Sequence, residues 1–250
     1  MTARLERINL APVKGLRLQH PSLVELTRVG VESNRRFYLV SGGRLYSGKD
    51  HGPLVSIGAT FERGRLTLAF PGGEQLGGEV ALGERLETDF WGRAVSGRVV
   101  VGPWSAALSE YSGVAVQLVQ SEQAGSATDI SVGTMLGRAS CERLGEELGA
   151  VIDPRRFRML LELGGLEAHA EDEWRGRRVR IGEAVVVAGG PVPRCVVTTQ
   201  DPDTGAVTLD TLRGIRSYRG LRAGRWIDFG VYFDVEQPGR VRLGDRVEPL

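Results

Sequence analysis

Short runs of β-branched and aromatic residues, separated by glycines, recur along this chain. Many of them alternate apolar with polar positions, which is the two-residue period of half-buried strands. The runs lie at 36–40, 65–70, 114–119, 179–181, 184–188 and 195–199. Gly182 and Glu183 stand between 178–181 and 184–188 as a two-residue hairpin turn. The pattern predicts many short strands joined by tight turns.

Helical periodicity is confined to two stretches. Apolar residues recur at 136, 139, 141, 144 and 148 and Gly149 follows as a stop, so we expect a helix from about Leu136 to Leu148. A short second helix is expected over Arg213–Arg219. A chain with many strands and few short helices is mainly β (α+β), built as a barrel or a two-sheet body.

The length of 250 residues allows one large domain or two small ones. Segment 71–97 is rich in glycine and predicts loops with short strands between them. We place a soft boundary at about 95–115, around Gly102-Pro103-Trp104. The expected domains are a smaller β-rich domain, 1–100, and a second domain, 101–250.

Charge and cysteine content narrow the function classes. The net charge of +1 gives no bulk attraction to nucleic acid or to an anionic membrane. The two cysteines have no paired spacing, which favours a reducing compartment. Residues 1–7 are charged and lack the apolar core of a signal peptide, and no apolar run has membrane-spanning length. We therefore expect a cytoplasmic protein with no nucleic-acid and no membrane partner.

Several common chemistries lack their motifs. The three histidines are scattered, and no His-x-x-His or Cys-x-x-Cys occurs, which disfavours a zinc site. A Gly-x-x-x-x-Gly-Lys-Ser phosphate loop, a dinucleotide-binding Gly-x-Gly-x-x-Gly and the Gly-x-Ser-x-Gly of hydrolases are also missing. No haem, flavin or iron–sulfur motif is present.

Residues 191–205 carry the most specific chemical signal. Cys195 follows Arg194 and two prolines, which fix φ on the approach to the thiol. The arginine charge favours the thiolate, which is the form that attacks or binds metals. A turn over residues 201–205 follows the β-branched run. A lone cysteine can also be a small buried hydrophobic residue, and Cys141, inside the predicted helix, fits that second interpretation.

Basic residues stand at the edges of other apolar runs. Lys14 follows Pro12-Val13, Arg35 and Arg36 precede the run ending at Val40, and Arg155, Arg156 and Arg158 flank Phe157. Arginine forks and a lysine charge suit a phosphate or a carboxylate. Side chains at strand ends are also commonly just solvated. The residues alone leave both interpretations open.

In order along the chain, these elements resemble those of MOSC-domain proteins (molybdenum cofactor sulfurase C-terminal domain) with the N-terminal β-barrel domain. Within this superfamily the sequence is most similar to the mitochondrial amidoxime reducing component and its bacterial relatives. The matching elements are Pro12-Val13-Lys14, 35–40, Arg156-Phe157-Arg158, 171–174, 180–183, 194–205, 230–233, Pro238-Gly239 and Gly244-Asp245. Residues 120–135 match poorly, and we expect them to line a substrate entrance.

The resemblance implies a molybdenum–pterin cofactor (molybdopterin). In the family a protein cysteine adds a third sulfur to the two of the pterin, and Cys195 is the matching residue. By the same comparison, Lys14, Arg36 and Arg158 would hold the pterin phosphate and ring. Arg194 would orient or electrostatically tune the catalytic site.

Three further residues are weaker candidates for hydrogen bonds to the cofactor. They are Ser140, Thr198 and Tyr232. At Gly15 the chain lacks the serine that the family usually places after the lysine, which removes one hydroxyl contact.

The implied activity is reduction of N-hydroxylated substrates such as amidoximes, hydroxylamines or N-hydroxylated base analogues. Electrons would come from a separate electron-carrier protein or reductase. An alternative is a sulfur-transfer or cofactor-handling module with a persulfide on Cys195. A third is a binder that delivers the cofactor without turnover.

Overall fold

Strands supply most of the regular structure in the computed structural model, which describes residues 3–250. In chain order they are β1 (Arg4–Ile8), β2 (Leu23–Leu26), β3 (Phe37–Ser41), β4 (Arg44–Tyr46), β5 (Gly58–Glu62), β6 (Arg65–Ala69), β7 (Gln75–Glu79), β8 (Ala81–Phe90), β9 (Arg93–Val101), β10 (Gln117–Ser121), β11 (Gly133–Gly137), β12 (Leu161–Gly164), β13 (Arg178–Ile181), β14 (Ala184–Pro193), β15 (Asp228–Gln237), β16 (Gly239–Arg242) and β17 (Val247–Pro249). The α-helices are α1 (Trp104–Ser112), α2 (Arg138–Leu148) and α3 (Thr211–Arg219), and the 3₁₀ helices are η1 (Gly52–Ser56), η2 (Pro154–Phe157), η3 (Ala170–Trp174) and η4 (Val196–Thr199). The prediction of a mainly β fold with few short helices is confirmed.

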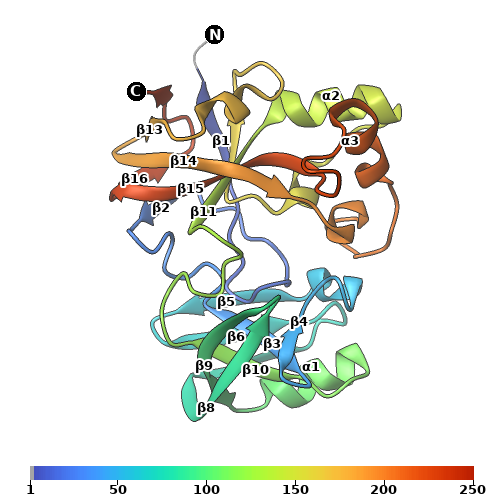
Figure 1. Cartoon of the computed structure of the whole chain (residues 1–250). Coiled ribbons are helices and arrows are strands. Elements are labelled where there is room, and N and C mark those ends of the chain that lie inside the picture. The colour runs from blue at the N-terminus through green and yellow to red at the C-terminus, as the bar shows by residue number, and fades with distance from the viewer. Residues whose placement is uncertain (1–2) are drawn as a thin grey trace.

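One body of the molecule is built on a seven-stranded sheet in the order β1-β12-β11-β15-β14-β13-β17 (Figure 1). The edge strands meet through an Arg4–Arg246 bridge and a hydrogen bond from the Val247 N–H to the Ala3 carbonyl (3.0 Å). The sheet therefore curls into a nearly closed barrel around buried side chains such as Leu5, Phe233 and Val186. Helices α2 and α3 pack on it through a second apolar cluster.

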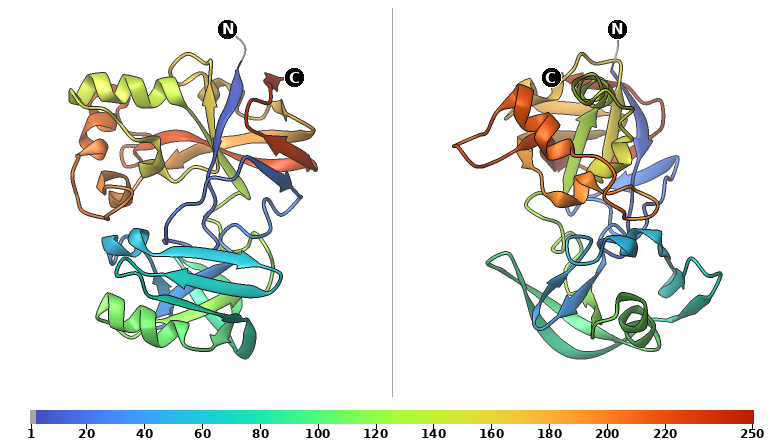
Figure 2. Two further views of the ribbon diagram at one scale, coloured as in Figure 1. Left: turned by 180° about the vertical axis from the view of Figure 1, so that it is seen from behind. Right: turned by 90° about the vertical axis from the view of Figure 1, so that its right-hand side faces the viewer.

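The other body contains a closed barrel in the order β10-β3-β4-β8-β9 and a three-stranded sheet, β5-β6-β7. Helix α1 contributes Trp104 and Leu108 to the same core as Phe37 and Leu118. Views from behind and from the side show this body below the seven-stranded sheet (Figure 2). Strands β1 and β2 pair with β12 and β16 of the first body, but Val13 between them bridges to Phe37 and packs in the lower core. The chain therefore visits the lower body before β2 and returns to it at β3. The predicted domain boundary at about 95–115 stays a prediction.

Several local predictions are confirmed and others are wrong. Ile181 pairs with Ala184 as the predicted hairpin requires, and α3 covers the predicted second helix. Helix α2 begins at Arg138 because residues 133–137 form β11, and α1 was not predicted. The predicted strand 195–199 is the 3₁₀ helix η4. There the hydroxyls of Thr198 and Thr199 bond back to local carbonyls, which competes with strand pairing.

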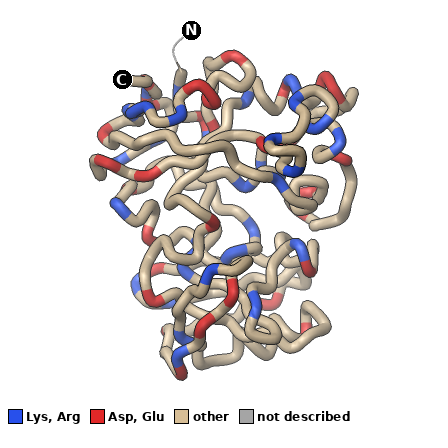
Figure 3. The backbone as a smooth tube through the Cα atoms, viewed as in Figure 1, with Lys and Arg blue, Asp and Glu red and all other residues tan. Residues whose placement is uncertain are grey.

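Charged residues of both signs are spread over the molecule. Lysine and arginine are interspersed with aspartate and glutamate over both bodies (Figure 3). Within residues 3–250, the helices are all too short or too polar to cross a membrane. Cytoplasmic localisation and the expectation of no nucleic-acid or membrane partner stay predictions. Residues 1 and 2 of the charged N-terminus lie outside the described residues.

The two bodies touch where the turn after Cys195 rests on η1. Gln200 Nε2 donates to the Gly48 carbonyl (2.7 Å). A Cβ added at Gly205 would lie 2.1 Å from the backbone of Gly52, and Gly205 has φ +76°. Only glycine accommodates both this left-handed backbone and this approach. The contact fixes the height of the 195–205 segment over the lower body.

We predict that Gly205→Ala lowers the free energy of unfolding by roughly 3 kcal/mol, because backbone strain and a backbone clash add. The matched control is Gly224→Ala, which has φ +70° and open space around the added methyl. The control should cost only about 1–2 kcal/mol. Urea unfolding of both variants measures the difference. Equal losses would show that the contact between the bodies adds nothing to stability.

Candidate functional site

A cavity lies between the two bodies and is lined by both. Five of the predicted site residues lie on its wall, namely Lys14, Arg158, Arg194, Cys195 and Thr198. The lower body contributes residues 47–49, Val55 and Trp91. Residues distant in sequence, from the first strand connection to the loop after β14, therefore meet in one place.

Cys195 is exposed and occupies the N-cap position of η4, directly after β14. Pairing of Pro193 with Asp228 and a hydrogen bond from the Arg194 N–H to the Ile227 carbonyl (2.7 Å) hold its backbone against β15. Cys141 is buried in α2, and burial raises the pKa of its thiol well above the usual range. A buried thiol of this kind is inert, so Cys195 is the reactive candidate.

The guanidinium of Arg194 is held by two backbone carbonyls. It donates to Phe229 O (Nε, 2.8 Å) and to Phe157 O (Nη1, 3.0 Å), and its Cζ lies 5.3 Å from the centre of the Phe157 ring. Burial lowers its pKa to about 10, so it keeps its charge near neutral pH. Arg194 thus ties the strand before Cys195 to the loop that carries Arg158.

Lys14 is buried where the chain passes from the upper sheet to the lower barrel. Its N–H donates to the carbonyl of Phe37, the first residue of β3 (2.7 Å). Its Nζ donates to Asp129 Oδ1 (2.6 Å) and to Ala127 O (3.0 Å). Burial lowers the pKa of Lys14 to about 8. The charge of Asp129 opposes this shift, and the charges of Arg35 and Arg158 add smaller lowering contributions.

Asp129 is the carboxylate of this cluster. Burial favours its neutral form, but the charges of Lys14 and Arg35 hold its pKa well below the usual range. Arg35 Nη1 lies 3.6 Å from Asp129 Oδ2. Arg158 Nη2 donates to the Leu16 carbonyl (2.5 Å), and burial lowers its pKa to about 10. Lys14 and Arg35 therefore share one anion, and Arg158 on the same wall adds a further positive charge, which leaves a surplus of positive charge there.

Arg35 and Arg158 both have left-handed backbones, with φ +53° and +51°. Such conformations cost roughly 1–3 kcal/mol each in a residue other than glycine and gather at functional sites. In this structure both of these left-handed residues are arginines that line the cavity.

The other predicted residues lie outside this wall or at its edge. Arg36 is not among the lining residues, and its neighbour Arg35 is. Ser140 is buried at the start of α2, where its hydroxyl donates to Glu171 Oε1 (2.9 Å). Tyr232 lines a small adjoining hollow behind Asp129 and Arg158. The structure thus brings Arg36 and Ser140 to other places than the cavity.

Some lining residues are not among the individually predicted site residues, and these include Arg35, Asp129, Thr134 and Trp91. Arg35 stands where the sequence comparison favours its neighbour Arg36. Asp129 and Thr134 lie within 120–135, the segment predicted to line the substrate entrance. Trp91 lies in the glycine-rich segment, where no sequence motif marks it as a site residue. Asp129 likewise belongs to no recognisable motif.

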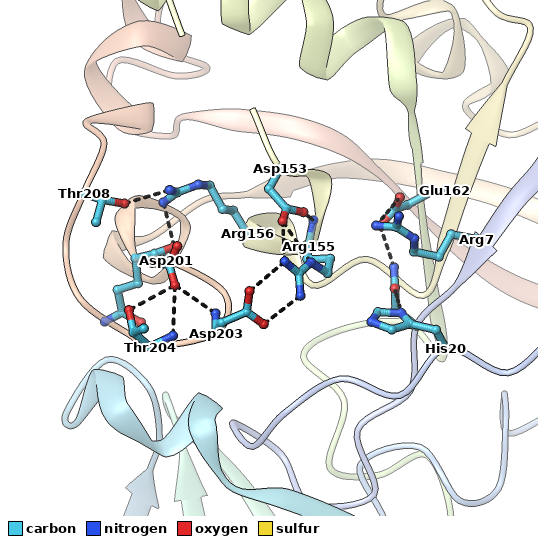
Figure 4. Close-up of polar contacts among 12 residues, drawn as sticks. Arg7, His20, Asp153, Arg155, Arg156, Glu162, Asp201, Asp203, Thr204 and Thr208 are labelled. Carbon is cyan, nitrogen blue, oxygen red and sulfur yellow. Dashed lines mark hydrogen bonds and ion pairs between the residues drawn. The ribbon is translucent and has the colours of Figure 1, made fainter. Parts of the chain in front are cut away.

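A layer of ion pairs supports the cavity wall (Figure 4). Arg155 bonds to Asp153 (2.6 Å) and to Asp203 (2.8 Å), which links the loop of Arg158 to the turn after Cys195. Arg156 donates to Thr208 Oγ1 (2.7 Å) and to the Gln200 carbonyl (2.7 Å). Within residues 3–250, the buried Arg156 Nε has no hydrogen-bond partner.

Two family models match the chain in tandem. The MOSC N-terminal beta barrel domain matches residues 2–111, and the MOSC domain matches residues 128–248. The family resemblance found in the sequence is thereby confirmed.

Curated relatives extend this result. Mitochondrial amidoxime-reducing component 1 of Mus musculus is 34% identical over 127 residues, which cover 48% of this chain and 37% of that protein. The match thus spans little more than a third of the mouse protein. Mitochondrial amidoxime reducing component 2 of Bos taurus is 26% identical over 94% of this chain and 80% of that protein. Among solved structures, the YUAD protein from Bacillus subtilis has a TM-score of 0.48 at 12% identity, covering 99% of this chain and 94% of that chain.

The lowered pKa of Lys14 predicts that anion binding in the cavity depends on pH. Anion binding to the cavity should weaken by about tenfold or more between pH 7 and 9.5, because Lys14 loses its proton near pH 8 and an anion favours the protonated form. Sulfate is the probe, since its charge is constant in this range. Tryptophan fluorescence reports binding, because the Trp91 ring lies 5.6 Å from Lys14 Nζ.

The control is Lys14→Arg, whose charge persists, so its affinity should be nearly independent of pH. Both chains carry Cys195→Ser, so that no thiolate charge in the cavity contributes. If the sulfate affinity of the chain that retains Lys14 does not change between pH 7 and 9.5, Lys14 does not hold the anion.

Proposed function

Since the chain belongs to the MOSC-domain proteins and carries a MOSC N-terminal beta barrel domain, we propose that its cavity binds a molybdenum–pterin cofactor and that the protein is an oxidoreductase. We further propose that it reduces N-hydroxylated substrates. The names of the mouse and bovine relatives refer to amidoxime reduction, which supports this choice of substrate class.

The donor set of the cavity fits such a cofactor. Lys14, Arg35 and Arg158 outnumber Asp129 on one wall, and an excess of lysine and arginine charge suits a phosphate group. Cys195 presents an exposed thiol to the same cavity, and a thiolate is the soft ligand that a heavy metal prefers. This pairing of surplus positive charge with one exposed thiol is the observation that carries the proposal.

Each residue has a distinct task in this account. Cys195 would ligate the metal, while Lys14, Arg35 and Arg158 would hold the phosphate-bearing part. Thr198 would stay structural, because its hydroxyl is already bonded to Thr211 Oγ1 (2.8 Å). When bound, the cofactor would supply two-electron redox chemistry, and the protein would hold and orient it.

The overall reaction balances with two electrons and two protons. The N–O bond of the substrate breaks, its nitrogen takes one proton in place of the hydroxyl, and the hydroxyl takes the other and leaves as water. A separate carrier protein would deliver the electrons and solvent would deliver the protons.

Asp129, ion-paired to Lys14, keeps a negative charge on the cavity wall.

A sulfur carrier with a persulfide on Cys195 is the second candidate. The exposure of the thiol at the mouth of a cavity favours it, because a transferable sulfur must reach another molecule. It differs from the reductase in needing no bound metal.

We predict that Cys195→Ser reduces viologen-driven reduction of benzamidoxime by at least about 100-fold, because the metal loses its protein ligand. The control is Cys141→Ala, a second thiol that lies in the packing of α2, outside the cavity lining. It should keep molybdenum and activity, at some cost in stability. Elemental analysis of each purified chain accompanies the assay.

Full molybdenum content and activity in Cys195→Ser would refute the assignment of the ligand. A metal-free wild-type chain with cyanide-labile sulfur on Cys195 would instead support the sulfur carrier.

A further inference from the structure

Trp91 reaches the cavity from the lower body. It lies at the tip of the hairpin between β8 and β9 and lines the same cavity as Cys195. Its side chain is 56% exposed, although tryptophan is usually among the better buried residues. Exposure of this kind at a cavity mouth calls for a reason other than packing.

The backbone under Trp91 is costly for a large side chain. Phe90 pairs with Arg93, which leaves Trp91 and Gly92 as a two-residue turn with φ +55° and +90°. Two positive φ values define the type I′ turn, whose first position favours asparagine, aspartate or glycine. Tryptophan therefore occupies a turn position at which asparagine would give a more stable protein. Its contact with Phe90 is one edge-on approach at 6.1 Å.

The ring stands next to the charged part of the site. Lys14 Nζ lies 5.6 Å and Lys49 Nζ 5.8 Å from its centre. Both distances fall within the range of cation–π attraction, which orients the ring. Trp91 is thus an exposed aromatic surface held beside the lysine that would contact the cofactor, and it belongs to the opposite body from Cys195.

We propose that Trp91 is a specificity-determining residue that stacks on flat, π-conjugated N-hydroxylated substrates and so selects them over aliphatic ones. The inference rests on the proposed reductase function and adds a substrate preference to it. Stacking of a ring on an aromatic side chain stabilises binding only when the ligand has a π face. An aliphatic substrate has the same N–O bond to reduce, and its kcat/KM should not fall when Trp91 is replaced.

The test compares benzamidoxime with acetamidoxime on the molybdenum-loaded enzyme. Trp91→Asn should lower kcat/KM for benzamidoxime by about 5- to 20-fold and for acetamidoxime by less than about twofold. Trp91→Phe keeps an aromatic ring and should retain most of the preference. Because asparagine tolerates the turn, Trp91→Asn should melt no lower than the wild type.

The matched control is Trp226→Leu. Trp226 is the other exposed tryptophan, at 39%, within residues 3–250, and it does not line the cavity. Its replacement should leave the ratio of the two kcat/KM values unchanged.

Three results would overturn the inference. Equal losses for both substrates would show that Trp91 acts on catalysis in general. A fall in molybdenum content of Trp91→Asn would assign the ring to the cofactor. An unchanged preference would remove it from the site.

Failure of the reductase proposal can be distinguished from failure of the stacking proposal for Trp91. A loaded wild-type enzyme that reduces neither amidoxime would end that proposal. Equilibrium dialysis would then still decide the stacking claim, since benzamidoxime should bind the wild type more tightly than Trp91→Asn. Equal binding would refute it.

Discussion

The gathering of Lys14, Arg35 and Arg158 on one cavity wall with a single carboxylate, Asp129, is the constraint on which the rest of this structure depends. Burial lowers the pKa values of Lys14 and Arg158, and repulsion from neighbouring arginine charges adds to the shift, so the charged wall is costly for the protein alone. A fold optimised for stability alone would neutralise or expose them. Their persistence on one wall is explained if an anionic ligand supplies the missing negative charge.

The fold maintains this arrangement by crossing between its two bodies. Strand β1 begins the chain in the upper sheet, and the segment that follows carries Lys14 to the start of β3. Arg155 links the loop of Arg158 to the turn after Cys195, and Gly205 rests that turn on η1. The thiol and the cations are therefore fixed by different elements that cannot shift independently. Such a frame is suited to holding a cofactor whose reactive atom must stay in place.

Local pattern predicted strands β3, β6, β13 and β14, the hairpin at Gly182 and α3, because these follow from side-chain period and turn chemistry. It did not predict the long strand β8, which lies in the glycine-rich segment expected to hold loops and short strands. Ordered motifs also predicted that Lys14, Arg158 and Cys195 would meet. Arg36 was predicted at the site, but Arg35 lines the cavity, since the left-handed backbone at Arg35 breaks the strand alternation just before β3. Asp129 and Trp91 were missed because their roles arise from tertiary position alone. The 3₁₀ helix η4 replaced a strand because its threonines bond locally.

The central claim is that the Cys195 sulfur and the cationic wall serve one bound molybdenum cofactor. X-ray absorption at the molybdenum edge of the purified protein tests it most directly. The account predicts sulfur scattering that decreases by one ligand in Cys195→Ser and is unchanged in Cys141→Ala. The same sulfur count in all three chains would contradict it, because the metal would then be held without the thiol on which the site is built.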